Sequence, residues 1–162
     1  PYKDQQRAAK EQQPKVDRLL IEPRLGERLP KHAPIEASND RHPVWVLKKM
    51  DLDGPWGWRS IPKGDLWELH ERLAALETMV WGKIDNCRDK VAHRLFHRMP
   101  VDVISSEAQK RLRAIGRRDV AELHRFLIKG KVRLWGVRVY NVFEVLWYDP
   151  DHLVYPTEPR NT

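Results

Sequence analysis

One stretch, residues 131–155, constrains the fold most, because apolar residues, turn residues and charged residues all indicate the same local structure there. Two runs, 132–139 and 142–148, are rich in Val, Trp, Phe and Tyr, which favour β-strands. Tyr140-Asn141 separates the runs, and Asn tolerates the left-handed backbone that a two-residue hairpin loop requires. The stretch therefore predicts a β-hairpin.

The loop length sets the register of this hairpin, and a shift of one residue would move every side chain to the other face. The predicted cross-strand pairs are Val139 with Val142, Val137 with Glu144, Trp135 with Leu146, and Arg133 with Tyr148. The opposite face is more apolar, so we expect it to pack on the core; it carries Leu134, Gly136, Arg138, Phe143, Val145 and Trp147. Asp149-Pro150 suits a turn, and a third strand is predicted over residues 153–155.

Upstream segments supply one strand and three helices. The apolar run 43–50 is of strand type, and Trp56 and Trp58 in the following Gly/Pro turn are expected to close one end of the core. A helix is predicted from Asp65, with Asp65 and Glu68 in a capping-box pattern. Its apolar stripe recurs every three or four residues, at Leu66, Leu69, Leu73, Leu76 and Val80.

Two further helices are predicted before the hairpin. One begins at Ser105-Ser106 and ends near Gly116, and the other begins with Asp119 and Glu122 and ends near Gly130. The resulting order of strand, three helices and a C-terminal three-strand meander is an α+β fold. We expect a small, mostly antiparallel sheet with helices on one face and the other face partly free.

The chain length of 162 residues suits one domain with an appendage. Residues 1–41 are rich in Gln, Pro and charge, and few of their apolar residues are large enough to build a core. They predict an extended or disordered N-terminal arm, either a solvated tail or a segment that orders on a partner, followed by an α+β domain over residues 42–156 and a tail over 157–162. The apolar anchor of such an arm would be Val16, Leu19, Leu20 and Ile21.

Charge and cysteine content narrow the class of partner. Lys and Arg number 30 against 23 Asp and Glu, a net charge of +7 that suits a polyanion such as nucleic acid. Cys87 is the only cysteine, which excludes an internal disulfide, and no apolar run or leader-like N-terminus indicates a membrane partner or export. The expectation is a soluble cytoplasmic protein.

Positive charge is most concentrated around the helix predicted from Ser106. Its Lys and Arg side chains are suited to phosphate backbones, where each contact releases counterions, although an ordinary helix surface in a basic protein looks the same. The predicted nucleic-acid-binding residues are Lys110, Arg111, Arg113, Arg117 and Arg118.

Two patterns suggest chemistry. His93 and His97 have the spacing of two zinc ligands on one helix face, but no second cysteine or HExxH pattern accompanies them, so we expect no metal and no other cofactor.

The hairpin register places Arg133, Glu144 and Tyr148 on the freer face, with His152 just beyond the turn. Such a set suits metal-independent RNA cleavage: Glu144 takes the 2′-hydroxyl proton, Arg133 stabilises the phosphorane, and His152 or Tyr148 protonates the 5′-oxygen. The other interpretation is ordinary strand residues, with Glu144 paired to an arginine across the sheet.

The order of elements and the closing WYDPDH motif resemble the RelE/ParE toxin superfamily. The resemblance implies a small sheet whose helix-free face meets RNA or an inhibitor. Members of the RelE type cleave ribosome-bound messenger RNA, those of the ParE type act on gyrase, and antitoxins wrap them with extended arms. The residues that match the ribonuclease branch are Arg133, Glu144, Tyr148 and His152. The motifs DGPWGW and SSEAQKRL and residues 133–156 also resemble a set of small actinobacterial proteins, which implies no particular activity.

The leading hypothesis is therefore an RNA-binding, toxin-like domain that acts as a metal-independent endoribonuclease or binds RNA without cleaving it. Its partners would be RNA and an antitoxin or larger protein held through residues 1–41. The alternative is a non-catalytic basic adaptor that docks on a larger protein or nucleoprotein through this arm and its basic helices. A helix-turn-helix over residues 105–129 that binds DNA is a third hypothesis.

Overall fold

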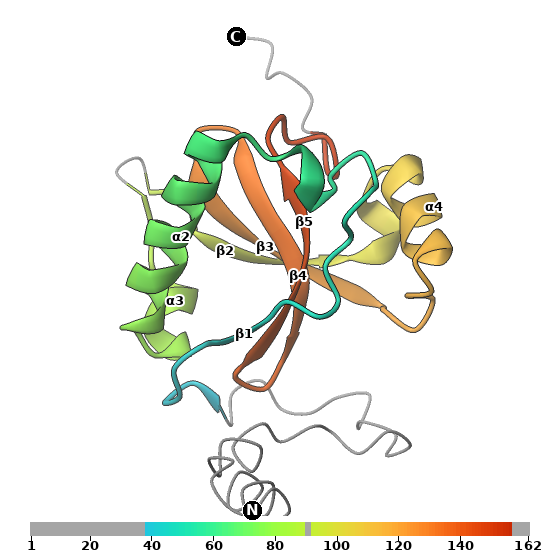
Figure 1. The fold of residues 1–162 in the computed structure, drawn as a ribbon. Helices are drawn as coiled ribbons and strands as arrows, with labels where there is room; N and C mark the ends of the chain where they lie inside the picture. Colours follow the sequence, from blue (N-terminus) through green and yellow to red (C-terminus); the bar gives the residue numbers. More distant parts are fainter. Residues whose placement is uncertain (1–37, 90–91, 157–162) are drawn as a thin grey trace, which may run out of the picture. The chain divides into compact units, whose positions relative to one another are not determined.

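The computed structural model describes residues 38–89 and 92–156. Five strands form one sheet in the order β1-β5-β4-β3-β2, which confirms the α+β class (Figure 1). The strands are β1 (Val44–Val46), β2 (Phe96–Pro100), β3 (Glu122–Lys129), β4 (Val132–Val139) and β5 (Val142–Asp149). The helices are α2 (Lys63–Glu77), α3 (Trp81–Asn86) and α4 (Ser106–Ala114), with single 3₁₀ turns η3 (Trp58–Ser60) and η4 (Val101–Val103). β1 runs parallel to β5, and all other neighbours are antiparallel.

Most of the predicted N-terminal arm, residues 1–37, and the predicted tail over residues 157–162 lie outside the described residues. Residues 38–41 are tied to the fold: the backbone carbonyls of Asn39 and Arg41 accept from Gly82 and Trp81 at the start of α3. The ordered fold thus includes the last four residues that the sequence assigned to the arm. Of the helices that the structure describes, none combines the length and apolar content needed to span a bilayer.

The predicted hairpin is confirmed, with Val139 opposite Val142, but the loop residue in the left-handed region is Tyr140, at φ 55°, and not Asn141. A β-bulge at Leu146 then changes the register, because Gly136 pairs with Val145 while Trp135 pairs with Trp147. The predicted pair of Trp135 with Leu146 is therefore wrong. So is the pair of Arg133 with Tyr148: Arg133 lies opposite Asp149, and Leu134 lies opposite Tyr148. A bulge of this kind inserts one residue and re-aims the side chains that follow it.

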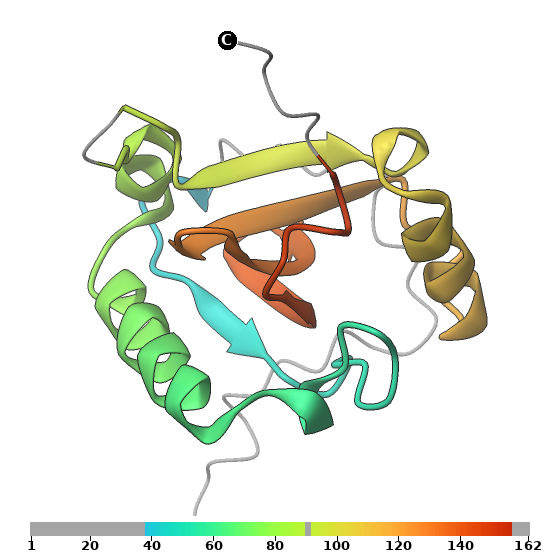
Figure 2. The ribbon, with the colours of Figure 1, turned by 90° about the horizontal axis from the view of Figure 1, so that it is seen from above.

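Both faces of the sheet are covered, so the prediction of helices on one face is wrong. On one face α2 and α3 pack through Leu69, Leu76 and Ile84 on a core cluster that includes Leu134, Phe143 and Val145. On the other, α4 packs through Ala108 and Leu112 on a cluster that includes Trp135, Leu146 and Trp147. Figure 2 shows α2 and α3 on one side of the strands and α4 on the other. The central strands are apolar on both faces, and such strands require a cover on each.

Trp147 is the one residue of the predicted core face that moved, because the bulge turns it to the α4 side. It packs there on Trp56, with ring centroids 5.4 Å apart, and Trp56 is buried as predicted. Trp58 is half-buried, and its indole N–H donates to the Leu146 carbonyl.

The helix predicted over residues 119–130 is wrong: this segment is strand β3, which pairs with β2 and β4. The helix-turn-helix hypothesis fails with it. The third strand predicted over residues 153–155 is also wrong, because this segment turns back onto the Asp149 side chain instead of joining the sheet. The helix predicted from Ser106 is confirmed as α4, with Ser105 Oγ accepting from the Ala108 N–H and Gly116 at φ 75° after its end.

Helix α2 begins two residues earlier than predicted, after Pro62, without a side-chain cap. Asp65 instead accepts a hydrogen bond from the Tyr148 hydroxyl at 2.8 Å. The inner face of α2 is built from Leu69, Leu73 and Leu76. Leu66 lies in line with this stripe near the start of the helix but is exposed, and Val80 already belongs to the cap of α3.

Candidate nucleic-acid interface

The four predicted catalytic residues do not form one group. Tyr148 is buried on the α2 side of the sheet, and its bond to Asp65 occupies its hydroxyl. Burial, and then the hydrogen bond to Asp65, raises the pKa of Tyr148, so this phenol is a poor proton donor. The cause of this separation is the bulge at Leu146, which turned Tyr148 away from the face that carries Arg133.

Glu144 lies on the same face as Arg133 but at the other end of β4. It pairs with Val137, four residues from Arg133, which corresponds to about 13 Å along a strand. Its carboxylate accepts from Arg117 Nη2 at 2.8 Å. Glu144 is therefore paired with an arginine, as expected if it is an ordinary strand residue and not a catalytic one. The arginine belongs to the loop after α4 and not to the sheet.

Two of the five residues of the predicted basic patch near α4 are also held in ion pairs. Arg111 donates two hydrogen bonds of 2.6 Å to Asp51, and Arg117 binds Glu144. Burial raises the pKa of Asp51, but the bonds from Arg111 and Trp147 outweigh it and hold this pKa below its usual value. The predicted residues that remain exposed are Lys110, Arg113 and Arg118.

The structure does bring Arg133 and His152 together, with residues that the sequence interpretation did not include. β2 places His97 opposite Arg125 of β3, and Arg133 of β4 lies opposite Leu127, two residues further along. Arg125 Nη1 donates to His152 Nε2 at 2.6 Å, so the unprotonated nitrogen of this imidazole faces the guanidinium. We name this group the Arg125 cluster: His97, Arg125, Arg133, His152 and Tyr155.

Asp149 positions the C-terminal part of the cluster. Its two carboxylate oxygens accept from the backbone N–H groups of Leu153 and Val154, both at 2.9 Å, and Oδ2 also accepts from the Trp135 indole. These bonds fold residues 152–155 back over the sheet. The Arg125 guanidinium carbon consequently lies 5.4 Å from the centre of the Tyr155 ring and 5.8 Å from that of Trp135, within the range of cation–π contacts.

The cluster concentrates positive charge in a half-buried position. Burial, and then Arg133, lowers the pKa of Arg125 to about 10. Burial, followed by Arg125 and Arg133, lowers the pKa of His152 to about 4, and the pKa of His97 is lowered by burial, Arg125 and other arginines. Both imidazoles are therefore neutral at pH 7, and the two guanidiniums remain charged.

Within the described residues, no acidic side chain forms an ion pair with Arg125 or Arg133, and Arg125 Nε is buried without a hydrogen-bond partner. The negative charge of Asp149 offsets part of the positive charge of these two arginines, but its carboxylate oxygens already accept hydrogen bonds from Trp135, Leu153 and Val154. Arg133 Nη1 donates to the Gly130 and Val132 carbonyls at 2.7 and 3.1 Å, and Arg125 Nη1 to His152. The Nη2 groups of these two neighbouring guanidiniums remain, and they are suited to an anion with several oxygens, such as a phosphate group.

His93 and His97 do not lie on a helix, so they do not share one helix face. His93 binds Asp89 before β2, and His97 lies on β2 with Nε2 donating to the Arg94 carbonyl. In the described part of the chain, no three His, Cys, Asp or Glu side chains converge as a metal site requires.

Sequence reasoning missed Arg125 and Tyr155 and considered His97 only as a metal ligand. The signal that could have found Arg125 is the alternation within ELHRFLIK, which as a strand puts Leu123, Arg125 and Leu127 on one face. Comparisons of the chain with protein-family models, with curated proteins and with solved structures found no match.

Proposed function

We propose that this chain binds single-stranded RNA, with the Arg125 cluster holding phosphate groups. The observation that carries the proposal is the pair of adjacent, half-buried guanidiniums, Arg125 and Arg133, with no ion-pair partner in the described structure. Arginine forks match phosphate oxygens in geometry and charge. The toxin-like character is kept only as a proposal, since the order of elements and the helix-free face that suggested it differ from those of the structure.

A single strand is the favoured form of nucleic acid for two reasons. Tyr155 is half-buried beside Arg125, so an aromatic ring and a guanidinium lie where an unpaired base could stack. In addition, the segment that would have supplied a recognition helix for duplex DNA is strand β3. The exposed residues Lys110, Arg113 and Arg118 lie on or just after α4, which covers the same face of the sheet, and they provide further phosphate contacts.

The test is fluorescence anisotropy of labelled single-stranded RNA, single-stranded DNA and duplex RNA with the full chain across a range of salt concentrations. Arg133→Ala should weaken RNA binding about 10-fold or more, since charge-assisted hydrogen bonds contribute about 1.5–3 kcal/mol. It should also reduce the salt slope by about 0.7 for each phosphate that the variant no longer neutralises.

Arg98→Ala is the matched control. Arg98 follows His97 on β2, so its side chain lies on the opposite face, and its replacement removes the same charge. RNA binding that responds equally to Arg98→Ala and Arg133→Ala would reduce the effect to net charge and contradict the proposed site.

RNA cleavage at the same cluster is a second candidate, which one observation favours. The Arg94 carbonyl can only accept a hydrogen bond, so His97 Nε2 carries the proton and the lone pair of the neutral imidazole is on Nδ1. Nδ1 can then take the proton of a 2′-hydroxyl while the oxygen of that hydroxyl attacks the phosphorus. A bound phosphate would offset the arginine charges and raise the pKa of His152, which could then protonate the departing 5′-oxygen. His97→Ala should abolish formation of 2′,3′-cyclic phosphate ends, measured by mass spectrometry, while RNA binding persists.

The adaptor hypothesis makes the opposite prediction. An adaptor that docks through residues 1–41 and its basic helices would lose its protein partner when this segment is removed. It would bind RNA only through the non-specific attraction that a net charge of +7 produces. Arg133→Ala would then leave partner capture unchanged. Residues 1–37 of that segment lie outside the described structure.

A further inference from the structure

Hydrogen-bond donors outnumber free acceptors in the Arg125 cluster. The guanidiniums of Arg125 and Arg133 only donate. His152 Nε2 accepts from Arg125, so the proton of this neutral imidazole is on Nδ1, which also donates. The carboxylate of Asp149 accepts, but both of its oxygens are already bonded to groups of the fold. The cluster is therefore complementary to groups that accept, such as the oxygens of a phosphate.

His97 is the exception. Its Nε2 donates to the Arg94 carbonyl at 3.1 Å, so the lone pair of the neutral ring is on Nδ1. Burial, and then the charge of Arg125, lowers the pKa of His97, which keeps the ring neutral at pH 7. Among the side-chain nitrogens of the cluster, His97 Nδ1 is the one acceptor that has no partner in the described part of the chain. It is not among the buried atoms that lack a partner, so solvent reaches it.

Strand pairing places this acceptor beside the guanidiniums. His97 on β2 lies directly opposite Arg125 on β3, and residues paired in this way have Cβ atoms about 5 Å apart on one face of the sheet. Arg133 lies on the same face, opposite Leu127 and so two positions further along β3. All three side chains are half-buried. A ligand held by Arg125 therefore meets the His97 ring as well.

The RNA backbone contains one group that matches such an acceptor. Phosphodiester oxygens and the ring oxygen of the sugar only accept, whereas the ribose 2′-hydroxyl can donate. This hydroxyl is on the carbon next to the one that carries the 3′-phosphate, so it comes close to the groups that bind that phosphate. DNA has no hydroxyl at this position and would leave His97 Nδ1 facing a C–H group.

We propose that His97 makes the Arg125 cluster selective for RNA over DNA, because its Nδ1 accepts a hydrogen bond from the 2′-hydroxyl that adjoins the bound phosphate. The inference rests on the phosphate binding proposed above, and it holds whether or not the chain cleaves RNA. The arginines supply the affinity for phosphate, and His97 distinguishes the sugar. One neutral hydrogen bond of this kind should make the Kd for RNA about 3- to 10-fold lower than the Kd for DNA.

The experiment is fluorescence anisotropy of the full chain with four labelled single strands that share one base sequence and differ only at the sugar. The strands carry 2′-hydroxyl, 2′-amino, 2′-fluoro or 2′-deoxy groups. The hydroxyl and amino strands can donate from this position, and they should bind about 3- to 10-fold more tightly than the other two. The fluoro strand keeps the sugar pucker of RNA, so it separates hydrogen-bond donation from sugar shape. The amino group attacks phosphorus poorly, so the amino strand stays intact even if the chain cuts RNA.

Two variants of His97 test the acceptor. His97→Phe keeps a flat ring without either nitrogen, so the four Kd values should come within about 2-fold of one another. His97→Gln provides a donor and an acceptor in one amide, so it should retain part of the preference for the hydroxyl and amino strands. Arg133→Ala should weaken the binding of all four strands by a common factor, because the guanidinium contacts the phosphate that they share.

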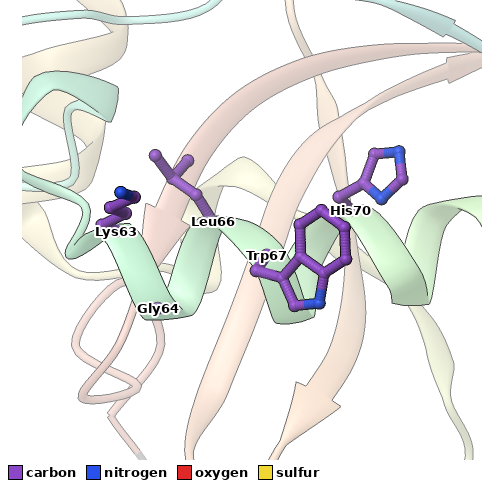
Figure 3. Close-up of a pocket in the computed structure, with 5 residues that line it drawn as sticks. All are labelled: Lys63, Gly64, Leu66, Trp67 and His70. Carbon is purple, nitrogen blue, oxygen red and sulfur yellow. The ribbon is translucent and has the colours of Figure 1, made fainter.

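His70→Phe is the matched control, because it makes the same substitution outside the cluster. Figure 3 shows the His70 ring close to Trp67 on α2, and α2 covers the other face of the sheet. This variant should keep the wild-type ratios between the four Kd values.

The outcomes separate the selectivity from the proposed function. Equal binding of all four strands that still depends on Arg133 overturns the role of His97 and leaves phosphate binding by the cluster in place. A preference for the hydroxyl and amino strands that persists in His97→Phe also overturns it. Binding that does not depend on Arg133 contradicts the proposed function, and the inference about His97 then fails with it.

Discussion

His124 should make the fold sensitive to mild acid. It lies on β3, is 3% exposed, and stacks on Phe96 at 5.4 Å with ring planes 13° apart. Its Nδ1 accepts from the Arg138 backbone N–H at 3.2 Å, which fits a neutral ring. Burial, and then the charges of Arg98 and Arg138, lowers the pKa of His124 from 6.5 to about 3.

The sign of the effect follows from proton uptake. Below pH 6.5 the unfolded chain binds a proton at His124, whereas the folded protein does not do so until about pH 3. Stability is therefore lost as the pH falls through this window. Each pH unit below 6.5 changes the free energy of unfolding by about 1.4 kcal/mol, so a change from pH 7 to pH 5 removes about 2 kcal/mol.

Urea unfolding of the wild type and of His124→Asn at pH 7 and pH 5 measures this contribution. The Asn side-chain oxygen can still accept from the Arg138 N–H, but it does not titrate. His124→Asn should be less stable than the wild type at pH 7, yet it should lose about 2 kcal/mol less between the two pH values. His152 titrates in the same window but is present in both proteins, so its effect cancels in the difference.

An equal loss of stability in the wild type and His124→Asn would refute the assignment of the effect to His124.

Three further outcomes are expected. Asp51→Ala removes a carboxylate that is 5% exposed and strands the Arg111 guanidinium, so it should lower the free energy of unfolding by about 3–5 kcal/mol in urea titrations. Gly136→Ala would place a Cβ atom against the Glu144 carbonyl oxygen and the Phe143 ring, and it should destabilise the fold by about 2 kcal/mol or more in thermal melts. Tyr148→Phe should cost about 1 kcal/mol by removing the bond to Asp65 while leaving RNA affinity, measured by anisotropy, unchanged.

Local chemistry accounts for the parts of the fold that were predicted correctly. The Tyr140-Asn141 loop, the Ser105 cap and the left-handed Gly116 are each set by interactions within a few residues. Such interactions are present in the chain before any tertiary contact forms, so the residue types reveal them.

The errors have a different origin. Asp119 and Glu122 resemble a helix start, but the segment after them has partners on both sides, and pairing with β2 and β4 outweighs the local preference. The bulge at Leu146 depends on how the hairpin packs between α2 and α4, and no turn signal in the sequence marks it. Because the bulge decides the face of Tyr148, the predicted set of catalytic residues could not be assembled correctly.

The α+β class, the hairpin, helix α4 and the excess of positive charge could thus be predicted from residue types and their spacing alone. The cover on both faces of the sheet and the meeting of His97, Arg125, Arg133 and His152 depend on the folded structure. These four residues come from three strands and a turn that are separated in the chain by up to 55 positions. Their proximity results from strand pairing and from the fold of residues 152–155 over Asp149, and interactions between distant segments of this kind leave no local pattern.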